Sequence, residues 1–102
     1  MVIRWTQRAT NDLTRICDYL AQHGNFTSRR VALTIYRRTN SLQKFPNRGR
    51  SGRVAGTREL ILTNLPYIIV YKVRQDTVQI VRILPGAQVW PERDFSVIAG
   101  GV

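Results

Sequence analysis

The stretch PYIIVYKVRQDTVQIVRIL, residues 66–84, contains two apolar runs of strand length that are separated by three polar residues. The connector RQD, residues 74–76, is short enough to join the runs 66–73 and 77–84 as an antiparallel hairpin. The first run is apolar at consecutive positions, which is typical of a strand that is buried on both faces. We therefore predict a β-hairpin whose first strand lies at the centre of a sheet.

Patterns elsewhere in the chain predict two further strands and two helices. RELILT, residues 58–63, precedes the hairpin, and VIRW, residues 2–5, reads as a short first strand. Between these strands, apolar residues recur at helical spacing. They predict a first helix over residues 7–23 and a second helix that begins after a cap at Thr27 and is stopped by Pro46.

The apolar positions of the two helices define the faces that we expect to be buried. Thr6 is the expected N-cap of the first helix. The apolar residues at helical spacing are Leu13, Ile16, Cys17 and Leu20 in the first helix, and Val31, Ile35, Leu42 and Phe45 in the second. The order β-α-α-β-β-β predicts an α+β fold in which two helices pack on one face of a small, mostly antiparallel sheet. The length fits a single domain over residues 1–102.

Positive charge is the strongest feature of the composition. The chain has 16 basic and 6 acidic residues, and every basic residue except Lys44 and Lys72 is arginine. The planar guanidinium of arginine grips phosphates and carboxylates with two hydrogen bonds, which lysine cannot do. Between Gly24 and Arg58 the chain has no acidic residue, and its basic residues there are Arg29, Arg30, Arg37, Arg38, Lys44, Arg48, Arg50, Arg53 and Arg58. We therefore expect an anionic partner to bind this segment.

The segment KFPNRGRSGRVAGTRELI, residues 44–61, places much of this charge on an irregular, glycine-containing loop. The glycines match neither a phosphate-binding P-loop nor a dinucleotide fingerprint, because the spacing differs and no predicted strand leads into them. A nucleic-acid backbone, an acidic protein segment and a solvated connection without a ligand are the three interpretations that the residues leave open.

The residue types needed for several other kinds of site are missing. One histidine, His23, and one cysteine, Cys17, cannot build a metal site of the His/Cys type, so we expect no metal and no other cofactor. His23 is expected on the surface at a helix end, and Cys17 is expected to be a small core residue rather than a reactive thiol. No apolar run is long enough for a membrane span, and the first residues lack a secretory signal, so we expect a cytoplasmic protein.

Two long motifs point to a family. FPNRGRSGRVAGTRELILTNLPYIIVYKV, residues 45–73, followed by VRILPGAQVWP, residues 81–91, closely resembles the RelE/ParE superfamily of toxins from bacterial type II toxin–antitoxin modules. RWTQRATNDLTRICDYL, residues 4–20, is similar to the first strand and helix of that family, so the resemblance covers residues 2–91. It implies a toxin that arrests growth and is neutralised by a cognate antitoxin in a hetero-oligomer.

The resemblance leaves two mechanisms open. RelE-like members resemble ribosome-dependent endoribonucleases that cut mRNA, whereas ParE-like members block DNA gyrase and lack the nuclease residues. Where RelE-like nucleases carry cations and other catalytic groups, this chain has Glu59, Ile68 and, at the end of the last strand, the run Pro85, Gly86 and Ala87. The resemblance therefore favours a ParE-like inhibitor of DNA gyrase, with an mRNA interferase as the alternative.

An unusual nuclease site remains a hypothesis for the residues that carry suitable groups. The side chains that would form it are Arg58, Tyr67, Tyr71, Arg82, Gln88 and Trp90. The competing interpretation is structural: Tyr67 and Tyr71 lie on one face of a strand as core aromatics with a polar tip, and Trp90 covers the core.

The architecture implied by the resemblance also suggests where partners bind. Arg48, Arg50 and Arg53 would rim the concave face of the sheet, and Arg37 and Arg38 belong to the same expected surface. This basic rim would receive either the antitoxin or the target of the toxin.

The charge of this segment leads to a kinetic prediction. We expect the cognate antitoxin to bind as an extended, partly acidic segment, so its association should be steered by the arginines and should accelerate as ionic strength falls. Stopped-flow measurements over a series of salt concentrations would check this. An association rate that does not change with salt would show that electrostatics do not drive recruitment.

Overall fold

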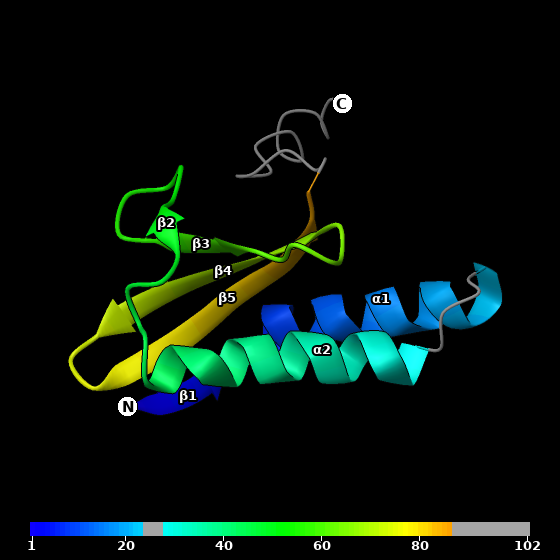
Figure 1. The fold of residues 1–102 in the computed structure, drawn as a ribbon, viewed down its shortest axis with the longest axis horizontal. Helices are drawn as coiled ribbons and strands as arrows, with labels where there is room; N and C mark the ends of the chain where they lie inside the picture. Colours follow the sequence, from blue (N-terminus) through cyan, green and yellow to red (C-terminus); the bar gives the residue numbers. More distant parts are fainter. Residues whose placement is uncertain (24–27, 87–102) are drawn as a thin grey trace.

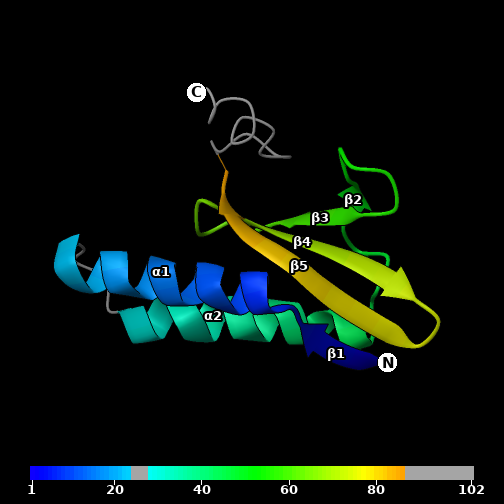
Figure 2. The ribbon, with the colours of Figure 1, turned by 180° about the vertical axis from the view of Figure 1, so that it is seen from behind.

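The computed structural model describes residues 1–23 and 28–86, and Figure 1 shows their arrangement. The elements follow the order β1 (Val2–Trp5), α1 (Gln7–His23), α2 (Ser28–Asn40), a 3₁₀ turn η1 (Ser41–Gln43), β2 (Arg50–Ser51), β3 (Arg58–Ile61), β4 (Tyr67–Arg74) and β5 (Thr77–Pro85). The strands form one sheet in the order β1-β5-β4-β3-β2, in which only β1 and β5 run parallel. Both helices lie on the same side of this sheet in Figures 1 and 2. The predicted α+β fold is confirmed.

The hairpin β4–β5 is the centre of the sheet, as the sequence predicts. Strand β4 occupies the middle position and buries residues on both of its faces. Ile69 and Tyr71 belong to the core beneath the helices, whereas Ile68 and Val70 form a smaller apolar cluster with Leu84 on the other face. The consecutive apolar residues of this strand are therefore explained by burial on both sides.

A β-bulge in β5 changes which of its residues face the helices. Val70 pairs with Arg82 and Tyr71 pairs with Ile80, so Val81 has no partner across the hairpin. The extra residue shifts the alternation of side chains, and Ile80 and Ile83 both enter the helix-side core although they are three positions apart.

Thr6 connects the start of α1 to this bulge. Its Oγ1 accepts a hydrogen bond from the N–H of Ala9 at 3.1 Å, which confirms the predicted N-cap. The same hydroxyl lies 2.9 Å from the carbonyl oxygen of Ile80 and 3.1 Å from that of Val81, and it can donate its proton to either. The cap therefore also fixes the first turn of α1 against β5.

Helix α2 differs from the prediction at its C-terminal end. Val31, Ile35 and Leu42 are buried as expected. The prediction that Phe45 is also buried is wrong, because this residue is 52% exposed. The helix ends at Asn40 and continues into a 3₁₀ turn, which advances a different angle per residue and rotates Phe45 off the apolar face. The expected cap Thr27 lies outside the described residues.

The basic loop contains a short strand that the sequence does not predict. Arg50 and Ser51 pair with Glu59 and Arg58 and form the edge strand β2. Two residues give too short a run for any alternation of apolar and polar side chains to be visible in the sequence.

Tyr71 fixes the path of the chain before β2. Its buried hydroxyl donates to the carbonyl oxygen of Pro46 at 2.7 Å and accepts from the N–H of Gly49 at 2.8 Å. A Cβ atom at position 49 would lie 2.8 Å from the tyrosine hydroxyl, so this close approach requires glycine. Tyr71 is thus a core aromatic with a bonded polar tip, as expected.

This contact predicts the effect of removing one oxygen atom. Tyr71→Phe leaves the Pro46 carbonyl and the Gly49 N–H without their partner, and should lower the free energy of unfolding by about 1–3 kcal/mol. Tyr36→Phe is the matched control, because Tyr36 is 53% exposed, and it should change stability by less than about 0.5 kcal/mol. Urea denaturation of both variants measures the difference, and equal stabilities would contradict the assignment.

Candidate functional site

Arg50 and Arg53 are bound to a buried carboxylate within the β2–β3 hairpin. Glu59 is 1% exposed, and its Oε1 accepts a hydrogen bond from Arg50 Nη2 at 3.2 Å. Its Oε2 accepts the backbone N–H of Arg53 at 3.1 Å and lies 3.6 Å from the Nε atom of that residue. The buried carboxylate therefore offsets part of the positive charge of the loop and holds the hairpin together, although the two arginine side chains are about half exposed.

Arg48 and Arg58 also make contacts within the chain. Nη1 of Arg58 donates to the carbonyl oxygen of Gly49 at 2.7 Å, which ties β3 to the preceding loop. The guanidinium of Arg48 lies 4.7 Å from the centroid of the Phe45 ring and donates to Ser41 Oγ at 3.3 Å. Both arginines thus have structural contacts as well as exposed surface.

The five arginines of the expected basic rim are spread over α2, the β2–β3 hairpin and the loop that joins them. Arg50 and Arg53 lie at the β2–β3 hairpin, whereas Arg37 and Arg38 lie in the last turn of α2. In Figure 1 the C-terminal end of α2 lies at the left of the view, below β2. Arg48 lies between them in sequence and contacts Ser41, directly after α2.

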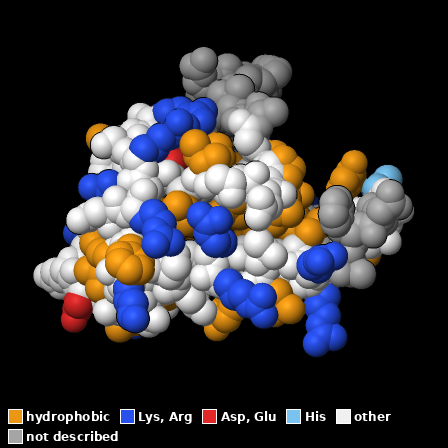
Figure 3. Space-filling view, viewed as in Figure 1, with side chains coloured by type: hydrophobic (Ala, Val, Ile, Leu, Met, Phe, Trp, Pro, Cys, Tyr) orange, Lys and Arg blue, Asp and Glu red, His pale blue; other side chains and the backbone are white. Residues whose placement is uncertain are grey.

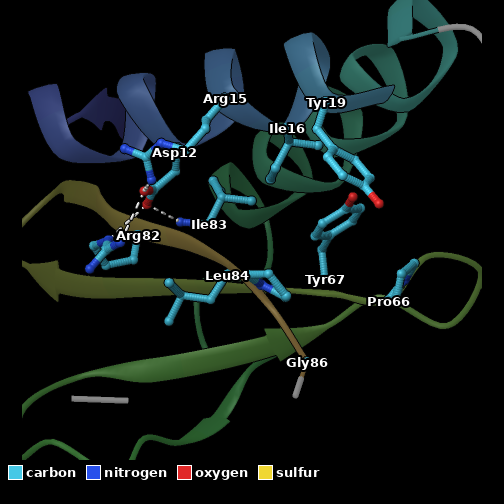
Figure 4. A pocket seen from close by; sticks show the side chains of 11 residues that line it. Asp12, Arg15, Ile16, Tyr19, Pro66, Tyr67, Arg82, Ile83, Leu84 and Gly86 are labelled. Carbon is cyan, nitrogen blue, oxygen red and sulfur yellow. Dashed lines mark hydrogen bonds and ion pairs between the residues drawn. The ribbon is translucent and has the colours of Figure 1, made fainter. Parts of the chain in front are cut away.

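A hollow lies between α1 and the ends of β4 and β5 (Figure 4). Its volume is about 450 Å³, and its surface is mainly apolar. Its lining consists of Asp12, Arg15, Ile16, Tyr19, Pro66, Tyr67, Arg82, Ile83, Leu84, Pro85 and Gly86. We call it the α1 pocket.

A buried ion pair forms one end of the α1 pocket. Arg82 donates from Nε to Oδ2 of Asp12 at 2.7 Å and from Nη2 to Oδ1 at 3.0 Å, and both side chains are 4% exposed. Oδ2 also accepts the backbone N–H of Ile83 at 2.9 Å. Figure 4 shows these bonds, which run from α1 to β5. Two hydrogen bonds in parallel hold the guanidinium in one orientation.

Sequence reasoning missed Asp12. The signal for a buried carboxylate was the helical spacing. Asp12 comes three residues after Ala9 and four before Ile16, and it therefore lies on the buried face of α1. A charged side chain on an apolar helical face needs a buried partner of opposite charge.

Tyr67 supplies the polar atom at the other end of the α1 pocket. Burial raises the pKa of the Tyr67 phenol above its ordinary value, and the neighbouring Cys17 and Tyr19 raise it further. The phenol is therefore neutral at physiological pH and is a hydrogen-bond donor rather than a base. Burial, followed by the charge of Asp18, also raises the pKa of the Cys17 thiol, which disfavours the reactive thiolate.

The candidate nuclease residues are only partly brought together. Tyr67 and Arg82 line the α1 pocket, whereas Arg58 lies on β3, which is separated from β5 by β4. Gln88, Trp90 and Ala87 lie outside the described residues. Within residues 1–23 and 28–86 there is no group of three or more His, Cys, Asp or Glu side chains that could hold a metal ion.

The sequence and the structure were compared with known proteins. The model of the family described as the ParE toxin of the type II toxin–antitoxin system parDE matches residues 3–90. This chain belongs to the ParE toxin family. The "Putative toxin Y4kP" of Sinorhizobium fredii is 38% identical over 90 residues, which cover 88% of this chain and 93% of the relative. The "Toxin RelE2" of Caulobacter vibrioides is 42% identical over 84 residues, covering 82% and 93%.

A solved structure shares the fold of this ParE-family toxin. It is described as a chromosomal ParDE toxin–antitoxin system from P. aeruginosa and superposes with a TM-score of 0.75 at 31% identity. The match covers 83% of this chain and 95% of the other. The predicted membership of the RelE/ParE superfamily is thus confirmed, and the protein is a toxin whose partner is an antitoxin. None of the described helices is long and apolar enough to cross a membrane.

The Asp12–Arg82 pair predicts an order of stabilities. Arg82→Ala leaves a buried carboxylate without its cation and should cost about 3–5 kcal/mol. Asp12→Ala should cost at least as much, because it also removes the acceptor of the Ile83 N–H. Arg15 is 3.6 Å from the same carboxylate but 72% exposed, so Arg15→Ala should cost no more than about 1 kcal/mol. Urea denaturation checks the order, and a large loss in Arg15→Ala would contradict it.

Proposed function

We propose that this ParE-family toxin arrests growth in the cytoplasm by inhibiting DNA gyrase, and that it does so by binding rather than by cutting RNA. The observation that carries the proposal is the bidentate contact between Arg82 and Asp12. Phosphate cleavage needs a cation aimed at the developing negative charge. In the α1 pocket this guanidinium is already held by a carboxylate.

The other requirements of RNA cleavage support the same proposal. Attack by a ribose 2′-hydroxyl needs a base that accepts its proton at physiological pH. Tyr67 has a raised pKa and stays protonated, so it does not meet this need. Arg58 is bonded to the loop before β2 and is separated from Arg82 by a whole strand. A base, a cation and an acid act together only when one site holds all three.

The α1 pocket suits a different role in this proposal, which is to receive the antitoxin. Its apolar surface, with Tyr19 and Ile16 on one side and Tyr67 and Leu84 on the other, fits apolar side chains of a segment that orders as it binds. Tyr19 is 59% exposed and is available for such a contact.

An mRNA interferase is the second candidate. Two observations favour it: Tyr67 and Arg82 line the same hollow, and a relative that is 42% identical is named "Toxin RelE2". This candidate requires Arg82 to exchange Asp12 for a phosphate, and it requires the Tyr67 hydroxyl for the chemistry.

The two candidates predict different results for purified protein. We expect the wild type to inhibit supercoiling by purified gyrase and to leave mRNA on translating ribosomes uncut. Tyr67→Phe keeps the ring and should not alter growth arrest. Arg58→Ala and Arg82→Ala should leave the absence of cleavage unchanged, with circular dichroism to show that they are folded.

The toxin–antitoxin complex serves as the control in both assays and should be inactive. A cut at a defined codon position by the wild type, lost in Tyr67→Phe, would overturn gyrase inhibition and establish the interferase. Loss of one preorganised phosphate contact would then reduce cleavage about 10²–10³-fold in Arg82→Ala.

A further inference from the structure

The outer face of α2 combines exposed apolar side chains with positive charge. Leu33 and Tyr36 are 42% and 53% exposed, and Arg29 and Arg37 are exposed beside them. These four residues follow the spacing i, i+4, i+7 and i+8, so they lie on one side of the helix. Val31 and Ile35 point the other way, into the core. We call Arg29, Leu33, Tyr36 and Arg37 the α2 face.

The charge of the α2 face is of one sign. Helix α2 contains four arginines and no acidic residue, whereas α1 carries Asp12 and Asp18 besides its own arginines. No ion pair within the described residues involves Arg29 or Arg37. In Figure 3 the surface over α2 shows basic side chains beside hydrophobic ones. This contrasts with the β2–β3 hairpin, where Glu59 binds the arginines.

The α2 face and the α1 pocket lie on different sides of the helix pair. Helix α2 packs against the side of α1 that carries Cys17, whose Sγ lies 3.8 Å from the carbonyl oxygen of Ser28. Asp12, Ile16 and Tyr19 line the pocket from a different side of α1. In Figure 1 α2 lies in front of α1, and in Figure 2 it lies behind. One short segment in the pocket therefore leaves the α2 face uncovered.

We propose that the α2 face is the surface with which the toxin docks on its target, and that it fits an acidic protein segment bearing apolar side chains. Carboxylates of that segment pair with Arg29 and Arg37, and its apolar side chains cover Leu33 and Tyr36. A phosphate backbone would satisfy the arginines but offers nothing apolar for Leu33. The inference rests on the proposed function in that the target is a protein.

Two double variants test the inference. Leu33→Gln/Arg37→Glu changes the α2 face, and glutamine forms helices about as readily as leucine. Ile61→Gln/Arg74→Glu is the matched control, since Ile61 is 44% exposed and Arg74 is exposed at the end of β4. Both variants change the net charge by the same amount. Growth arrest is measured in cells without antitoxin, and affinity for purified antitoxin by titration calorimetry.

We expect the α2-face variant to lose growth arrest and to need about tenfold or more protein to inhibit purified gyrase. It should keep its affinity for the antitoxin within about twofold, and the control should match the wild type in all assays. Tyr19→Ala, in the pocket, should show the reverse pattern: weaker antitoxin binding and intact growth arrest. If the first variant does not fold, Arg29→Glu/Tyr36→Ala changes the same face and should give the same result.

Three results would overturn the inference. An α2-face variant that is as toxic as the wild type shows that the target binds elsewhere. A tenfold loss of antitoxin affinity in that variant assigns the face to the antitoxin. Binding of a labelled RNA or DNA duplex by the wild type, lost in the variant, assigns it to nucleic acid. Failure of the wild type to inhibit gyrase, with growth arrest still lost in the variant, rejects gyrase but supports this docking surface.

Discussion

The arrangement of α1 on the sheet depends on the hydrogen bonds that the carboxylate of Asp12 accepts from β5. Strand β1 pairs with β5 only as far as Ile80, so beyond that point β5 would be an open sheet edge. Asp12 accepts the N–H of Ile83 in place of a neighbouring strand and binds the Arg82 guanidinium at the same time. Helix α1 therefore crosses the end of β5 at a fixed position, and the α1 pocket is the space that this crossing leaves.

Arginine has two distinct roles in this toxin, and the neighbouring acceptors decide between them. In the β2–β3 hairpin, Arg50 and Arg53 bind Glu59, and Arg58 binds backbone carbonyl oxygens. Helix α2 has no acidic residue, and no ion pair within the described residues involves its Arg29 or Arg37. A count of basic residues along the sequence treats these arginines alike, although the first group stabilises the fold and the second is available to a partner.

The sequence predicts the elements whose evidence is local. The apolar run of β4, the short connector to β5 and the cap at Thr6 each depend on neighbouring residues, and the structure confirms them. The Asp12–Arg82 pair joins residues that are 70 positions apart, so no local pattern reveals it. The bulge at Val81 lies inside an apolar run that has no glycine or other local sign of an irregularity. The turn after Asn40 changed the helical phase, which is why the prediction for Phe45 was wrong.

The parallel pairing of β1 with β5 has a consequence for the order of folding. Thr6 and Ile80 are joined although they are 74 positions apart, and Val2 pairs with Thr77. During synthesis β1 therefore has no partner until the last strand of the sheet has left the ribosome. Closing so long a loop costs conformational entropy, and the contacts that offset this cost form only when the sheet is complete. The five-stranded sheet can therefore be completed only after translation has passed β5.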